Sequence, residues 1–117
     1  MTKAERIFND TYRECRNHIK KYGYEDNSGF NSMFYRDNEV FYRRNASAVQ
    51  KIIDGERKQL YIDRKIGALS EERIKFLENA LNMVQVTLNN TTTIWAETAS
   101  AVYWYWWDRL NIINEVK

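Results

Sequence analysis

The last part of the chain lacks the residues that most readily interrupt a helix. No glycine follows Gly67, and the whole sequence has no proline. The apolar residues after this glycine recur at spacings of three and four, which is the period of one face of an α-helix. They are Ile74, Leu77, Leu81, Val84 and Leu88, followed in the same phase by Trp95, Ala99, Val102, Trp106, Leu110 and Ile113. The pattern predicts two helices that meet near residues 89–93, or one long C-terminal helix.

Two helix starts carry the usual capping signals. Thr2 and Glu5 form a capping box, and an amphipathic pattern follows them as far as Gly23. Ser70 is placed to cap a helix whose first turn is acidic. The stretch 25–29 is a loop by composition.

The middle of the chain is less clearly patterned. Its apolar residues favour a helix over about 37–53 that Asp54-Gly55 ends or interrupts. A further segment around Leu60 continues the helix and stops at Gly67. We therefore predict a mainly α fold, a single helical domain over residues 1–117 with about four helices. The alternative is an α+β fold with short hairpins near 33–44 and 84–95, because β-branched and aromatic residues favour strands.

Composition argues against most catalytic and metal-based functions. The chain has 117 residues, enough for one domain, with one cysteine and one histidine. Cys15 and His18 lie one helical turn apart, but structural zinc needs four such ligands. The glycines are too scattered for a phosphate-binding loop. We predict that the protein is not an enzyme and that it has no cofactor, no metal site and no catalytic residue.

Charge and cysteine content bear on location. The single Cys15 cannot form an internal disulfide, and charged residues stand at the start of the chain where a signal peptide would be apolar. The sparsely charged stretch 79–107 is interrupted by asparagine and threonine, so it is not a membrane span. We expect a cytoplasmic protein without a membrane partner.

A run of aromatic residues, Tyr103 to Trp107, is the most distinctive local feature. Helical residues turn by about 100°, so such a run covers the whole circumference of a helix and does not fit one core face. Exposed tryptophan and tyrosine are favoured anchors of protein interfaces. We predict binding of a protein partner, or homo-oligomerisation, through Trp95, Tyr103, Trp104, Tyr105, Trp106 and Trp107. The competing interpretation is a central helix that its neighbours bury on every side.

Nucleic-acid binding is the alternative function. Basic side chains share one face of the first helix, and others are interleaved with aromatic residues, as in proteins that contact phosphates and stack on bases. They are Arg13, Arg16, Lys20, Arg36, Arg43 and Arg44. Neighbouring acidic residues dilute both groups, and the net charge is only +2. This function is therefore second to protein binding.

No motif in the chain points to a known family. Abundant asparagine, lysine, isoleucine and tyrosine without proline suggest AT-rich coding, as in many bacteria and their phages. By association, one interpretation is a phage- or mobile-element-type regulator or inhibitor of a host complex.

Overall fold

Five α-helices, and no strand, make up the part of the chain that the computed structural model describes. This part comprises residues 2–22, 32–90 and 97–116, without the side chains of residues 4, 32–37, 97 and 113–116. The helices are α1 (Lys3–Tyr22), α2 (Ser32–Arg44), α3 (Ala46–Lys65), α4 (Glu71–Asn89) and α5 (Glu97–Val116). The predicted mainly α fold is confirmed.

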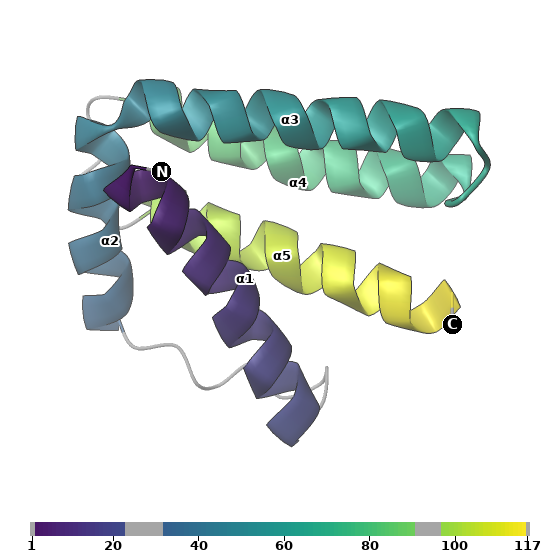
Figure 1. Cartoon of the computed structure of the whole chain (residues 1–117), viewed down its shortest axis with the longest axis horizontal. Coiled ribbons are helices and arrows are strands. Elements are labelled where there is room, and N and C mark those ends of the chain that lie inside the picture. Colours follow the sequence, from purple (N-terminus) through teal and green to yellow (C-terminus); the bar gives the residue numbers. More distant parts are fainter. Residues whose placement is uncertain (1, 23–31, 91–96, 117) are drawn as a thin grey trace.

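The helices are arranged around α5. Figure 1 shows α3 and α4 side by side as an antiparallel hairpin, with α5 on one side of it and α2 across one end of the bundle. Helix α5 packs against α4, α1 and α2, and α3 packs mainly against α4. The core therefore collects apolar side chains from all five helices, including Phe8, Tyr42, Ile53, Leu81 and Val102.

The predicted helix ends are confirmed where they can be compared. The backbone N–H of Thr2 donates to the carboxylate of Glu5 at 2.8 Å, and the N–H of Glu5 donates to the Thr2 hydroxyl at 3.1 Å. The Ser70 hydroxyl accepts from the N–H of Arg73 at 3.3 Å and caps α4. Gly67 has φ = 69°, a left-handed conformation that favours glycine after a helix end.

The predicted helix break at Asp54-Gly55 is wrong. Helix α3 runs through both residues, and the boundary between α2 and α3 falls at Asn45 instead. The backbone N–H and the side-chain amide of Asn45 both donate to the carbonyl of Phe41, each at 3.0 Å. Burial of Ile53 on one side of the glycine and Leu60 on the other outweighs the intrinsic cost of Gly55, about 1 kcal/mol.

The two hairpins of the α+β alternative are also corrected. Residues 33–44 lie in α2 and residues 84–89 lie in α4, while residues 91–95 are outside the described part. The buried stripe from Ile74 to Leu88 explains the outcome in α4, because a spacing of three and four buries one face only in a helix. Asn90 adopts an extended conformation after α4, so two helices replace a single long one.

Candidate interaction surface

The aromatic run of α5 lies mostly in the core. Tyr103, Tyr105, Trp106 and Trp107 are buried, whereas Trp104 is 38% exposed. Three helices surround α5, and they cover more of its circumference than one core face would. The structure thus agrees with the central-helix interpretation for these four rings. Trp95 lies outside the described residues.

The basic residues do not gather in one patch. Arg13, Arg16 and Lys20 share an exposed face of α1, where Arg13 pairs with Asp10 at 3.4 Å. Arg43 instead turns inward, and its guanidinium donates to a carboxylate of α2 and to a carbonyl of α4. Arg44 is exposed on α2, and the side chain of Arg36 is outside the described part.

A buried polar network, which sequence reasoning missed, joins α3 to α5. The Tyr105 hydroxyl donates to Glu56 at 3.0 Å, and Nη2 of Arg109 donates to Asp63 at 3.1 Å. Burial, and then the charge of Glu56, raise the pKa of Tyr105 well above its ordinary value. The available signal was the heptad spacing of Glu56 and Asp63 on the same face as Leu60. Because each carboxylate is engaged, the network aligns the two helices.

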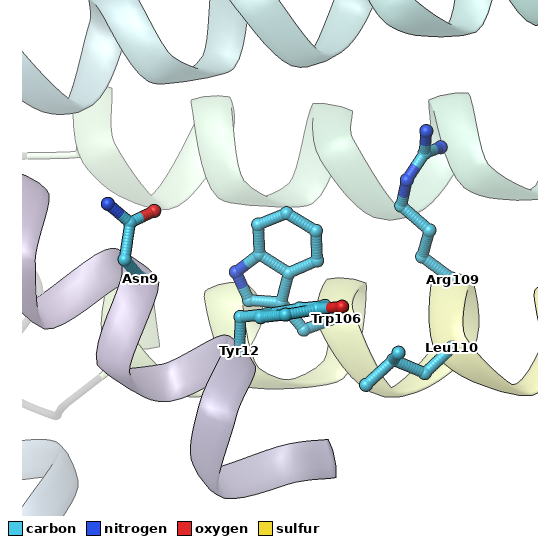
Figure 2. A pocket seen from close by; sticks show the side chains of 5 residues that line it. All are labelled: Asn9, Tyr12, Trp106, Arg109 and Leu110. Carbon is cyan, nitrogen blue, oxygen red and sulfur yellow. The ribbon is translucent and has the colours of Figure 1, made fainter.

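A shallow pocket of about 350 Å³ lies between α1 and α5. Figure 2 shows its lining residues, with the indole of Trp106 between Asn9 and Arg109 and the ring of Tyr12 beside it. Nε1 of Trp106 and Nη1 of Arg109 are buried without a hydrogen-bond partner. The indole nitrogen lies on the Asn9 side, however, and the guanidinium points away from Tyr12. The two donors do not converge on one ligand atom, so the pocket is a weak candidate.

The strongest candidate is on the α3–α4 hairpin, and it begins with the polar seam between these helices. Hydrogen bonds join Gln50 to Gln85, Arg57 to Asn82 and Gln85, and Arg64 to Glu71 and Glu78. The α3 positions of the seam are seven residues apart, as expected for two helices in lengthwise contact. The seam fixes which side chains of each helix point away from the bundle.

Each residue that directly follows a seam position points to the outer side of the hairpin. In a right-handed helix the next residue is rotated by about 100°, and in an antiparallel pair these rotations lead to the same side. On α3 they are lysines, and on α4 two are apolar. The resulting outer face carries Lys51, Lys58 and Lys65 from α3 and Glu72, Asn79, Met83 and Val86 from α4, to which Phe76 is added because it lies two turns before Met83.

The α4 part of the outer face is an exposed apolar row. Phe76, Met83 and Val86 are 54%, 57% and 58% exposed, and Phe76 lies on the same stripe because it precedes Met83 by seven residues. Sequence reasoning did not single them out. The available signal was that they are apolar yet out of phase with the buried stripe of the same helix. An amphipathic helix ordinarily carries polar residues at such positions.

Other kinds of site are not found in the described part of the structure. Among its residues, no group of three or more histidine, cysteine, aspartate or glutamate side chains could hold a metal ion. Within the same ranges, no helix is long and apolar enough to cross a membrane. Comparisons with protein-family models, curated proteins and solved structures gave no significant match to this chain.

Proposed function

We propose that this chain is a non-enzymatic interaction protein that binds a protein partner through the outer face of the α3–α4 hairpin. The proposal rests on one observation, the row of Phe76, Met83 and Val86, each more than half exposed on one stripe of α4. Isolated exposed apolar residues are common, but an aligned row marks an interaction site more often than chance exposure does. Large apolar side chains of this kind anchor helices in protein interfaces.

Site-specific photocrosslinking tests this proposal. A photoreactive phenylalanine analogue replaces Met83 in one variant and Asn17, an exposed residue of α1, in a matched control. In lysate of the source cells, the probe at Met83 is expected to give one discrete protein adduct that the control lacks. Equal adducts from both positions, or none from Met83, would contradict the proposal. An adduct of two copies of this chain would assign the face to self-association.

Binding through the C-terminal aromatic run remains a prediction, and it is now limited mainly to Trp104. Since four of its rings lie in the core, Trp104 is the ring of Tyr103 to Trp107 that offers the most surface. Trp104→Ala is expected to leave the fold intact and to change oligomeric state or partner binding if this segment takes part. Light scattering after size exclusion, together with the crosslinking yield at Met83, separates the two surfaces.

Nucleic-acid binding through α1 is a second candidate, which the exposed face of Arg13, Arg16 and Lys20 favours. Cations on one helix face can neutralise phosphates, and their contribution falls steeply as salt rises. The test is retardation of single- and double-stranded DNA and RNA at low salt, with Arg16→Glu/Lys20→Glu as the variant. Absence of retardation for the wild-type chain would exclude this function.

We also propose a reducing compartment such as the cytoplasm, because the single cysteine of the chain cannot form an internal disulfide. Cys15 is a buried free thiol, and burial raises its pKa far above the ordinary value. A thiol that stays protonated and enclosed has little reactivity toward oxidants. Its role is that of a small apolar core residue.

A further inference from the structure

The lysines of the outer face indicate the chemistry of its partner. Because Lys51, Lys58 and Lys65 run parallel to the apolar row, we propose that this face binds an acidic amphipathic helix. Such a helix would lie over the α3–α4 seam, with apolar side chains on the α4 row and carboxylates toward the α3 lysines. This inference rests on the proposed function and specifies the class of partner.

The lysines are available for a partner. Among the described residues, none of the three forms an ion pair with a carboxylate, whereas their neighbour Arg64 is paired with Glu71 and Glu78 across the seam. Lys65 lies over the ring of Tyr61 at 5.5 Å from its centre, which leaves its charge at the surface. All three lysine side chains are exposed.

The dimensions of the face match a helix of a few turns. The lysines are spaced by seven residues, so Lys51 and Lys65 are about 21 Å apart along α3. The apolar row from Phe76 to Val86 covers about 15 Å of α4. A partner helix of about 18 residues would contact both rows along their length. Met83, near the end of this row, has a flexible thioether that adapts to different apolar neighbours.

The charges disfavour a second copy of this chain on the same face. A two-fold axis along the helices would place each lysine row on the apolar row of the other copy, and an axis across them would oppose the two lysine rows. With the axis along the helices only Lys65 would face a carboxylate, that of Glu72, and with the axis across them the lysines would face one another, so Lys51 and Lys58 lack a carboxylate in both. Burying an unpaired ammonium group is costly, and Asp54 is already hydrogen-bonded to Gln50. An acidic amphipathic helix from another protein would bring carboxylates to the α3 lysines and apolar side chains to the α4 row at the same time.

Selection from a displayed library of random peptides, about 18 residues long, against the purified full chain tests the inference. Enriched peptides are expected to be acidic, with apolar residues at spacings of three and four. Their affinity, measured by fluorescence anisotropy, should fall about tenfold with Lys51→Glu/Lys58→Glu and with Met83→Glu, and should weaken as salt rises. Arg6→Glu/Lys21→Glu on α1 has the same change in net charge and should change affinity less than about twofold.

The outcomes separate this inference from the proposed function. Neutral or basic peptides that bind through Met83, or acidic ones insensitive to the Lys51/Lys58 reversal, would overturn the acidic-helix chemistry and leave protein binding in place. Peptides that are all insensitive to Met83→Glu would overturn both. Circular dichroism of each variant confirms the fold. Failure to enrich peptides, with Met83-dependent binding to phosphatidylcholine–phosphatidylserine vesicles instead, would assign the face to a lipid surface and also overturn the inference.

Discussion

Glu39 and Arg43, one turn apart on α2, form a 2.7 Å ion pair that contacts the adjacent ends of α4 and α5. The other carboxylate oxygen of Glu39 accepts from the N–H of Ala99 in the first turn of α5, at 3.0 Å. Nη1 of Arg43 donates to the carbonyl of Leu88 in the last turn of α4, at 2.9 Å. Each charge therefore faces the helix end of opposite polarity and satisfies a backbone group that the helix leaves unpaired.

Replacing Glu39 by alanine is expected to lower the free energy of unfolding by about 2–4 kcal/mol. The change removes the acceptor for the Ala99 amide and leaves the half-buried Arg43 without its carboxylate. Urea unfolding followed by circular dichroism measures the loss. Asp10→Ala is the control, because its ion pair with Arg13 is exposed and should contribute less than about 1 kcal/mol. Equal losses in the two variants would contradict the assigned role of Glu39.

Two variants of the polar network between α3 and α5 should lower the free energy of unfolding by different amounts. Tyr105→Phe removes one hydrogen bond to Glu56 and should cost about 1–2 kcal/mol. Arg109→Met removes the cation that faces both Glu56 and Asp63, and should cost about 3–5 kcal/mol. Chemical denaturation gives both values. If Arg109→Met were no more destabilising than Tyr105→Phe, the guanidinium would not be the group that stabilises the two carboxylates.

Two glycines should respond in opposite ways to replacement by alanine. Gly55 lies inside α3 with open space around its Cβ position, so Gly55→Ala should stabilise the chain by about 0.5–1 kcal/mol. Gly67 has φ = 69°, where a side chain is strained, so Gly67→Ala should destabilise it by about 1 kcal/mol. Thermal unfolding shows both signs directly. A loss of stability in Gly55→Ala would argue against a continuous α3.

Local signals in the sequence predicted much of the fold. The caps at Thr2 and Ser70 and the stop at Gly67 depend on neighbouring residues alone, so they could be read without the structure. The continuity of α3 through Gly55 could not, because burial of residues far apart in the chain determines it. The Glu39–Ala99 contact, between residues 60 apart, left no local pattern either.

The candidate site was harder to predict than the fold. How much of Tyr103 to Trp107 is covered depends on how many helices surround α5, and periodicity does not give that number. The outer face needs the antiparallel pairing of α3 with α4, since Lys58 and Met83 share a side only in that arrangement. What the sequence did contain was the out-of-phase position of Met83 on an otherwise amphipathic helix.

Asp108 makes stability depend on pH. Burial raises its pKa to about 6, above the ordinary value near 3.9, so between these values the folded chain binds more protons than the unfolded chain. Its contribution therefore lowers stability as pH rises from about 4 to about 6, and the penalty is complete at pH 7. A pKa difference of about two corresponds to about 2.7 kcal/mol, which partial solvent contact reduces to about 1–2 kcal/mol.

Asp108→Asn tests this dependence because it removes the titrating group and keeps a similar shape. The variant should be more stable than the wild type at pH 7 and should lose this advantage near pH 4. Urea unfolding at a series of pH values measures the difference between the two curves, in which the other titrating groups largely cancel. A difference that stays constant with pH would show that the carboxyl is not the cause.

Substitutions in the apolar row of the outer face should abolish partner binding and leave the stability of the fold nearly unchanged. Because Phe76, Met83 and Val86 are more than half exposed, the triple change to glutamine removes little buried area, and glutamine has a good helix propensity. We expect the free energy of unfolding of the triple variant to stay within about 1 kcal/mol of the wild type. With the photoreactive probe kept at Met83, changing Phe76 and Val86 alone to glutamine should abolish the protein adduct. Val84→Gln, at a fully buried position of the same helix, is the contrasting variant and should cost several kcal/mol. If the triple variant were destabilised as strongly as Val84→Gln, the apolar row would be part of the core, and its exposure would no longer argue for a partner.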